Sequence, residues 1–401
     1  MPKGLEVEGF DEKWTAFSLR DKESEDIDEL LISYYEWYLW DCASDDITGD
    51  GKAEIVGASE DSTLRVIDGN NKELWSKNFH RAVFFCDIAD INKDGNKEVI
   101  CGGVEGKVFV FDKSGNPKWE KEIGKWVYEA QIADITGDGK LEIIATSRDK
   151  TIRIIDCEGN ELWQQKFKRY VKHCGFGDIN GNGKLEVIGS DDDKFLKVFD
   201  NKGNELWEFQ FKLMPPDAMI EVRSDVVFAT GDLTKDGKEE IIAGSDDSFL
   251  RVFNGSGKEL WNYKFDGAVH TISIGDINND GNLEIIVGAE PELDPEGKAT
   301  EKTKNLIVFD NTGKILWHKK FDGGVFCSTI GDVNKDGKPE LVVGTQTSFI
   351  GIFDKDGNDI GHYKFDNYVR KIALGDIDGD GQLEIIGASR DHTIRALKFK
   401  K

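Results

Sequence analysis

The chain has 401 residues, with 77 acidic against 52 basic side chains and a formal net charge of −25 at pH 7. This excess argues against a nucleic-acid partner, because phosphate backbones are bound mainly by Lys and Arg. No apolar run is long enough to insert into a membrane. No signal segment opens the sequence, which as written predicts a cytoplasmic protein, or an extracellular one if a leader has been removed.

The first forty residues differ from the rest of the chain. Residues 11–20 hold a short strand candidate around Trp14, and an acidic stretch follows at 21–29. Residues 26–32 have room for one or two helical turns. An aromatic run, 34–40, then leads into the first copy of a repeated motif.

This motif, Asp-x-Asp/Asn/Thr-x-Asp/Asn-Gly-x-x-Glu, occurs eight times, and most copies lie 44 residues apart. The copies begin at Asp46, Asp90, Asp134, Asp178, Asp232, Asp276, Asp332 and Asp376. A fixed period of this size indicates a repeat architecture. Each copy carries acids at positions one, five and nine, except that Asn182 replaces one acid. The motif thus accounts for nearly the whole net charge.

Three features of the motif favour Ca²⁺, which prefers six to eight hard oxygens. Oxygen-bearing side chains stand at alternate positions of a tight loop, a Gly allows the bend, and a Glu follows four residues beyond position five. The alternative is a hairpin whose carboxylates only cap backbone N–H groups. Eight copies that all end in Glu favour metal, and Mg²⁺ is less favoured because it retains several waters. We therefore predict up to eight calcium ions. The expected ligands are Asp46, Thr48, Asp50, Lys52, Glu54, Asp90, Asn92, Asp94, Asn96, Glu98, Asp134, Thr136, Asp138, Lys140, Glu142, Asp178, Asn180, Asn182, Lys184, Glu186, Asp232, Thr234, Asp236, Lys238, Glu240, Asp276, Asn278, Asp280, Asn282, Glu284, Asp332, Asn334, Asp336, Lys338, Glu340, Asp376, Asp378, Asp380, Gln382 and Glu384, with position seven acting through its carbonyl. Counting acids predicts that the eighth loop is the tightest and the fourth the weakest.

Four strand patterns fill each period. In the third unit they lie at 127–133, 142–145, 151–156 and 161–167, and the second of them is apolar on consecutive residues, as in a strand buried on both faces. Four antiparallel strands repeated around a ring predict an all-β propeller, with one domain over 1–401. Eight blades are expected, and seven blades plus a hairpin are the alternative. The last blade lacks its outer strand, which we expect the segment around Trp14 to supply. The Trp of the other outer strands is expected to pack between blades.

The loops resemble the calcium-binding FG-GAP repeats of integrin α-chain propellers and the related VCBS repeats. Phe176-Gly177-Asp178 and the Gly-Ala pairs at 57–58, 288–289 and 387–388 match the residues that name the family. The chain departs from it in two ways, since position nine is Glu where the family usually has Asp, and the Pro after Gly-Ala is absent. The resemblance implies a calcium-binding propeller.

Three segments interrupt the period, at 20–37, 212–224 and 290–304. In a propeller they would all emerge opposite the calcium loops, and insertions gathered on one face mark a binding face. The same face should carry aromatic and Arg residues, a composition typical of interaction hot spots. The expected partner-binding residues are Arg81, Trp126, Arg169, Tyr170, Tyr368 and Arg370.

Three functions remain open. The first is a calcium-stabilised scaffold or adaptor that binds another protein and has no catalytic residues. The second is a lectin-like propeller that binds a glycan, although the loop aromatics differ from blade to blade. The third, less favoured, is a polysaccharide lyase, which would need a basic cleft near a calcium ion.

Overall fold

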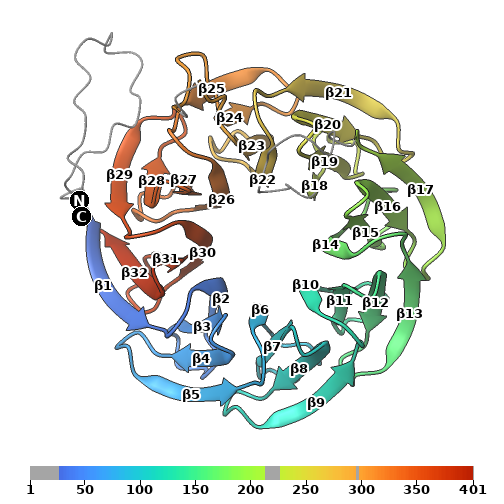
Figure 1. The fold of residues 1–401 in the computed structure, drawn as a ribbon, viewed down its shortest axis with the longest axis vertical. Helices are drawn as coiled ribbons and strands as arrows, with labels where there is room; N and C mark the ends of the chain where they lie inside the picture. The colour runs from blue at the N-terminus through green and yellow to red at the C-terminus, as the bar shows by residue number, and fades with distance from the viewer. Residues whose placement is uncertain (1–26, 213–225, 295–297, 401) are drawn as a thin grey trace.

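Eight four-stranded antiparallel sheets form a closed ring in the computed structural model, which describes residues 27–212, 226–294 and 298–400. Figure 1 shows the sheets as blades around a common centre. This confirms the all-β, eight-bladed prediction over the seven-bladed alternative. The described residues form no helix, and hence none that is long and apolar enough to cross a membrane.

Each blade runs from an inner to an outer strand. The inner strands are β2 (Leu39–Asp45), β6 (Val83–Ala89), β10 (Val127–Ala133), β14 (Val171–Gly177), β18 (Val227–Gly231), β22 (Val269–Gly275), β26 (Val325–Gly331) and β30 (Val369–Gly375). The second strands are β3 (Glu54–Ser59), β7 (Glu98–Gly103), β11 (Glu142–Ser147), β15 (Glu186–Asp191), β19 (Glu240–Gly244), β23 (Glu284–Ala289), β27 (Glu340–Thr345) and β31 (Glu384–Ser389). The third strands are β4 (Thr63–Ile67), β8 (Lys107–Phe111), β12 (Thr151–Ile155), β16 (Phe195–Phe199), β20 (Phe249–Phe253), β24 (Leu306–Phe309), β28 (Phe349–Phe353) and β32 (Thr393–Phe399). The outer strands are β5 (Glu73–Asn78), β9 (Pro117–Glu122), β13 (Glu161–Lys166), β17 (Glu205–Gln210), β21 (Glu259–Lys264), β25 (Ile315–Lys319), β29 (Asp359–Lys364) and β1 (Ile27–Tyr34). We number the blades from β2–β5, blade 1, to β30–β32 with β1, blade 8.

The second strands are buried along their whole length, as their continuous apolar sequences predict. They can be buried on both faces because each blade packs between two others. Val56 of β3, for example, belongs to the same buried cluster as Cys86 of β6 and Val99 of β7 in the next blade. The hydrophobic core therefore lies between blades and runs around the ring.

The outer-strand Trp residues join neighbouring blades. Trp163 of blade 3 donates its indole N–H to the carbonyl of Asn201, 3.2 Å away in the β16–β17 hairpin of blade 4. Gly203 of that hairpin has φ +85° and lies so close to the Trp163 ring that a Cβ would contact it at 2.9 Å. Trp75, Trp119, Trp207 and Trp317 donate to the next hairpin in the same way. The predicted interblade packing is confirmed.

The N-terminal prediction was wrong in its details. The strand that closes blade 8 is β1, which pairs antiparallel with β32, whereas Trp14 lies outside the described residues. Residues 27–34 are thus neither helical nor part of an insertion at 20–37. A bulge between Glu29 and Leu31 interrupts the alternation that would have revealed the strand. Leu31, opposite Ala396, is buried where six of the other outer strands have Trp and β29 has Gly361.

The two faces of the ring differ. The calcium-type loops join inner to second strands, and they share a face with the hairpins between third and outer strands: Lys113 of one hairpin lies 3.1 Å from Asn96 of the second loop. We call this the loop face. The remaining connections define the opposite face. Residues 290–294 and 298–304, in the connection from β23 to β24, lie there as expected, whereas 295–297 and most of 212–224 lie outside the described residues.

Candidate functional site

The repeated loops are held by their own carboxylates. In the first loop, Asp46 accepts a hydrogen bond from the N–H of Gly51 at 2.9 Å, and Asp50 accepts one from Lys52 at 2.9 Å. Glu54 reaches back from β3 to accept from Ile47, also at 2.9 Å. Gly51 has φ +86°, a left-handed conformation that Gly adopts without strain. Positions one, five and nine thus shape the loop.

The same three hydrogen bonds recur in the other seven loops, at 2.7–3.1 Å. This is the arrangement expected of a turn capped by carboxylates. It also leaves oxygens for an ion, because each bond to the position-nine Glu from position two engages only its Oε2. In the first loop, Oε1 contacts only the Thr48 hydroxyl, at 3.3 Å.

The Glu residues at position nine are nearly inaccessible to solvent. The effect of this burial on their pKa values indicates whether the loops suit a cation. The pKa of Glu284 is raised to about 7, mainly by burial and also by the neighbouring charges of Asp280 and Asp276, against the backbone hydrogen bond from Ile277. Burial likewise raises the pKa of Glu340 to about 7. A buried carboxylate beside other acids is stabilised by a cation, so these donor sets are suited to calcium.

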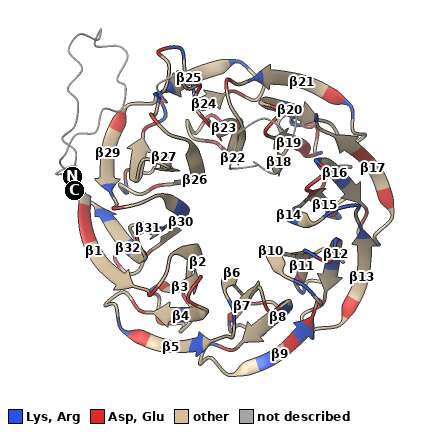
Figure 2. Cartoon of the chain, viewed as in Figure 1, with Lys and Arg blue, Asp and Glu red and all other residues tan. Residues whose placement is uncertain are grey.

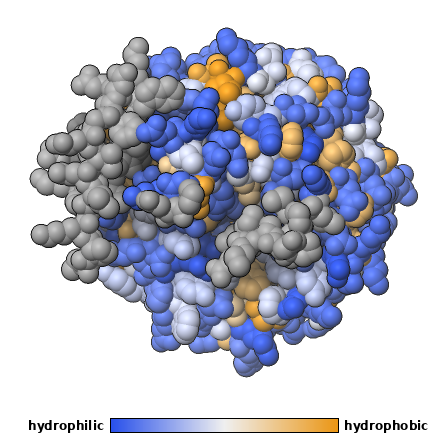
Figure 3. Space-filling view, turned by 45° about the horizontal axis from the view of Figure 1, so that its top comes forward, coloured by the Kyte–Doolittle hydropathy of each residue, from blue (hydrophilic) through white to orange (hydrophobic). Residues whose placement is uncertain are grey.

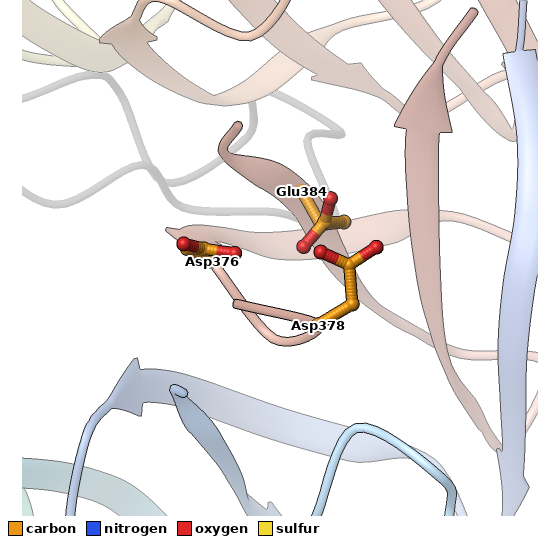
Figure 4. A group of neighbouring side chains, drawn as sticks. All are labelled: Asp376, Asp378 and Glu384. Atoms are coloured by element: carbon orange, nitrogen blue, oxygen red, sulfur yellow. The ribbon is translucent and has the colours of Figure 1, made fainter. Parts of the chain in front are cut away.

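The eighth loop brings three acids together. Oxygens of Asp376, Asp378 and Glu384 lie within 4.8 Å of one another, the one such group among the described residues, and Figure 4 shows them around one turn. Lys398 of β32 also enters this loop. Its Nζ contacts Asp378, lies 2.9 Å from Asp380 Oδ2 and lies 3.0 Å from Glu384 Oε1. An ammonium group therefore lies among the carboxylates that would bind the ion.

The second loop has a similar contact, because Lys118 of β9 places its Nζ 2.6 Å from Glu98 Oε1. In the other six loops, the Oε1 of this Glu contacts a Thr hydroxyl or an Asn amide at position three instead. In the first loop and in the third to seventh loops, therefore, no lysine of the described chain contacts Oε1 of the Glu at position nine.

On the opposite face, β-bulges aim side chains toward the centre of the ring. Seven inner strands have a register shift near their start, each leaving one residue unpaired. A bulge redirects such a side chain. The unpaired residues are Trp40, Phe84, Tyr128, Lys172, His270, Phe326 and Arg370. Five of these seven residues lie on blade 8 and blades 1–4, while His270 and Phe326 lie on blades 6 and 7.

Blade 8 and blades 1–4 enclose a cavity of about 830 Å³, which we call the mouth cavity. Trp40, Phe84, Trp126, Tyr128 and Arg370 are among its lining residues. A second cavity of about 480 Å³ lies between the inner strands, and the two share lining residues, so they form one continuous space. The shared residues are Glu129, His173, Arg370 and Lys371. Both volumes are in the range of small-ligand sites, about 300–1,000 Å³.

Most polar groups in this space bind one another. Lys371 Nζ lies 3.5 Å from Asp41 Oδ1, and His173 Nδ1 lies 3.1 Å from Glu129 Oε2. The Asp41 carboxylate raises the pKa of Lys371 against the effect of desolvation, so the ammonium stays charged. The Lys371 side chain is 49 % exposed, yet it is surrounded by the ring, where water reaches it through the cavity. Figure 2 shows the Lys and Arg segment of β30 at the centre of the ring.

Three arginines lie on aromatic rings at the rim. Arg148 is 4.1 Å from the ring centroid of Trp126 and 5.1 Å from that of Tyr170 in the next blade. Arg390 occupies the equivalent turn of blade 8, between Tyr368 and Tyr38. Arg370 lies 4.5 Å from the Trp40 ring. Cation–π contacts of this kind fix the position of a guanidinium group.

The predicted partner-binding residues are distributed around this rim. Arg81, Trp126 and Arg370 line the mouth cavity, and Tyr170 and Tyr368 flank the two arginines just described. Arg169 is 61 % exposed and pairs with Asp193. The sequence reading missed Tyr38, Trp40, Phe84, Tyr128, Arg148 and Arg390. The signal for the two arginines was present, since Ser-Arg-Asp occurs at this turn only at 147–149 and 389–391.

The surface outside the cavity is mostly hydrophilic in the view of Figure 3.

A family model described as an FG-GAP-like repeat matches residues 232–287. The chain is a β-propeller, and this part of it matches an FG-GAP-like repeat. A second model, the lambda-carrageenase β-propeller domain, matches residues 36–117 and 104–172 of the propeller. The resemblance inferred from the loops is thereby confirmed.

Solved structures with the same fold are distant in sequence. Sqt1 of Saccharomyces cerevisiae has 12% identity and a TM-score of 0.71 over 93% of this propeller and 99% of that chain. BamB from Moraxella catarrhalis has 14% identity and a TM-score of 0.63 over 93% and 100%. A structure of BBS1N in complex with ARL6DN has 8% identity and a TM-score of 0.56 over 94% and 97%. No curated protein matches the sequence. At these identities the likeness shows the fold alone.

Proposed function

We propose that the propeller is a calcium-stabilised, non-catalytic scaffold that binds a partner protein with the face opposite its loops. The observation that carries this proposal is the concentration of aromatic and Arg side chains around the mouth cavity, on one arc of the ring. Trp, Tyr and Arg are the residues enriched in interaction hot spots. Trp40, Trp126, Tyr128 and Arg370 come from three blades that are not all adjacent in sequence, so the rigid ring holds them in place.

Calcium would act on the loop face, away from this cavity. Its ligands would be the side chains at positions one, three, five and nine and the carbonyl at position seven, in up to eight loops. When bound, calcium supplies counter-charge to carboxylates that otherwise repel one another. The loops already hydrogen-bond their own backbone, so the ion would tighten an existing geometry, as Asp46 and Glu54 illustrate.

Site-specific photo-crosslinking in the organism that encodes the chain tests the binding face. A photoreactive residue at Arg169, exposed on the opposite face, should yield one discrete cross-linked protein. The same residue at Lys202, exposed in a hairpin on the loop face, is the matched control and should not. A product from Lys202 alone, or from neither position, would contradict the proposal. The cross-linked protein, once purified, should then bind the propeller in a buffer that contains calcium. This result separates binding from mere proximity in the cell.

Carbohydrate binding is the second candidate. The match to the lambda-carrageenase β-propeller domain favours it, because the matched residues 36–172 include Trp40, Phe84 and Trp126 of the mouth cavity. A glycan array probed with the purified propeller distinguishes the candidates, since a lectin would retain a defined glycan without any protein partner. A lyase would need its basic cleft beside a calcium ion, whereas Arg370 and Lys371 belong to a cavity that opens opposite the loop face.

A further inference from the structure

Arg370, in the lining of the mouth cavity, and Arg390, on the rim beside Tyr38 and Tyr368, have no counter-ion in the described chain, as is also true of Arg81 and Arg148. Arg153, Arg251 and Arg395, on third strands, each pair with at least two carboxylates. Arg370 and Arg390 instead contact only aromatic rings with their side chains, and neither pairs with a carboxylate among the described residues. In a chain so rich in Asp and Glu, this lack of pairing needs a physical explanation.

The arrangement is unfavourable without a ligand. Both arginines are partly buried, and the Nε of Arg390 is buried without a hydrogen-bond partner. Arg370 lies on Trp40 and Arg390 lies on Tyr38, and the centroids of these two rings are 6.1 Å apart, so the two guanidinium groups are close enough to repel each other. Burial lowers the pKa of Arg370, and the like charge of Arg390 lowers it further. A desolvated charge is stabilised only when it is paired. An anionic group between the two arginines would supply that pairing.

The rest of the cavity indicates what else the ligand carries. Most of its other charged groups are already engaged, since Lys371 is paired with Asp41, His173 with Glu129, and Lys172 with Asp192 at 2.8 Å. Arg81, an exposed lining residue, is an exception among the described residues.

Trp40 donates its indole N–H to Glu60, so this N–H is not available to a ligand. The lining that remains is aromatic or aliphatic, and includes Phe84, Trp126, Tyr128 and Val104. A sugar rich in hydroxyl groups would find few unpaired polar side chains here. An apolar side chain beside an acidic one would bury its surface against the rings while its carboxylate met the guanidinium groups.

We propose that Arg370 and Arg390 bind the carboxylate of an acidic segment of a partner protein, and that a neighbouring apolar side chain of this segment fills the mouth cavity against Phe84 and Trp126. This rests on the proposed function, and it names the chemistry that the partner presents. Carboxylates suit the pair because guanidinium groups form two parallel hydrogen bonds with them. The aromatic rings beneath Arg370 and Arg390 hold the donors in position before the ligand arrives.

Selection from a displayed library of random 12-residue peptides tests this chemistry without a known partner. The full chain in calcium should enrich peptides in which Asp or Glu stands next to Leu, Ile or Phe. Binding of these peptides should weaken about tenfold or more in Arg370→Gln/Arg390→Gln, as expected when a charged hydrogen-bonding partner is lost. The control is Lys202→Gln/Lys258→Gln, which removes the same charge from exposed hairpins of the loop face and should bind normally.

A change in the ligand keeps the test independent of folding. Replacing the acidic residue of a selected peptide by its amide should weaken binding to the unmodified chain about tenfold or more. Equal binding of acid and amide, or enrichment without acids, would overturn the proposal. Binding of heparin, a sulfated polysaccharide, that depends on Arg370 and Arg390 in the absence of peptide enrichment would also overturn it. These outcomes are distinguishable from failure of the proposed function, because the photo-crosslink at Arg169 requires neither arginine.

Discussion

Lys398 Nζ lies 3.0 Å from Glu384 Oε1, inside the loop that carries the most acids. Strand pairing explains how it comes to be there. Leu397 of β32 pairs with Ile385 as Ile155 of β12 pairs with Ile143, so Lys398 is the counterpart of Asp156, which begins a hairpin in blade 3. Blade 8 has no such hairpin because its outer strand comes from the N-terminus. The position is therefore available to a cation.

Replacing Lys398 by Met should create a tighter calcium site in the eighth loop. The ammonium competes with the ion for Asp378, Asp380 and Glu384. Calorimetric titration should count one more tight site in the variant than in the wild type. In EDTA the variant should be less stable, by about 3 kcal/mol, since Glu384 is fully buried and would lose its cation.

The control for this change is Lys400→Met. Lys400 lies on the same segment but pairs with Asp28 at 3.0 Å, away from the loop. It should alter neither the number of sites nor the response to EDTA. If Lys398→Met leaves the calcium stoichiometry unchanged, the eighth loop is a hydrogen-bonded turn whose acids are simply neutralised by lysine.

Removing calcium should lower the melting temperature steeply. An ion that binds only the folded state stabilises it by about 2.7 kcal/mol per site at a hundredfold excess over Kd, and the first loop and the third to seventh loops are open to one. Differential scanning calorimetry in EDTA, in millimolar Ca²⁺ and in millimolar Mg²⁺ measures this effect. Calcium should restore the transition and Mg²⁺ should restore it less. If the melting temperature is the same in all three conditions, the loops are turns that are capped by carboxylates and do not depend on calcium.

Ring closure should depend on β1 and not on the residues before it. Ile27 and Leu31 of this strand are buried, and their burial contributes about 3–6 kcal/mol. Deleting residues 1–34 also exposes the edge of β32, which promotes aggregation. We expect this deletion to lower the melting temperature and increase light scattering, while deletion of residues 1–26 serves as the control. Equal melting of the two deletions would rule out closure by β1.

Asp87→Asn should stabilise the propeller at neutral pH. The pKa of Asp87 is raised from 3.8 to about 6, mainly by burial and also by the charges of Asp41 and Asp45, while the hydrogen bond from Ile88 and the charge of Lys371 oppose the rise. Because the folded-state pKa lies above the unfolded one, ionising Asp87 destabilises the fold as pH rises from about 4 to 6. Asn keeps an acceptor for the N–H of Ile88, now 2.8 Å from the carboxylate.

The measurement compares melting temperatures of the variant and the wild type between pH 4 and 7. The two should coincide near pH 4, and the variant should melt higher above pH 6. Asp112→Asn is the control with opposite sign: burial is the largest single effect and raises the pKa of Asp112, but the hydrogen bonds from Asn116 and Ser114 together outweigh it and lower the pKa. That variant should be the less stable one at pH 7. A constant gap for Asp87→Asn at every pH would exclude its ionisation as the cause.

The sequence was sufficient to predict eight blades, because the period of the motif and the apolar pattern of the strands point to the same architecture. Glu54–Ser59 is apolar after its Glu and is buried throughout, and the same pattern in seven other units leaves one architecture. The closing strand was missed because Ile27–Tyr34 carries a bulge and has Leu31 in place of Trp. Trp14 resembled the missing strand in sequence, but local pattern does not specify which segment pairs across the whole chain.

The mouth cavity was only partly predictable for a similar reason. Arg81, Trp126 and Arg370 stood out by composition, and all three line it. Trp40 and Phe84 look like ordinary strand residues in sequence, because the bulge that turns them toward the cavity is a property of strand pairing. The Lys398 contact was missed because counting acids in a loop ignores a cation that arrives from another strand.

The pairing of β1 with β32 also sets an order of events during synthesis. Ile27 leaves the ribosome long before its partner Phe399, because almost the whole propeller is made between them. Blades 1 to 7 can form as they emerge, but blade 8 cannot be completed before β32 has been made. The nascent chain must therefore carry an unpaired strand at one end of a growing arc, and the final closure is a contact between the most distant parts of the chain, a slow type of step.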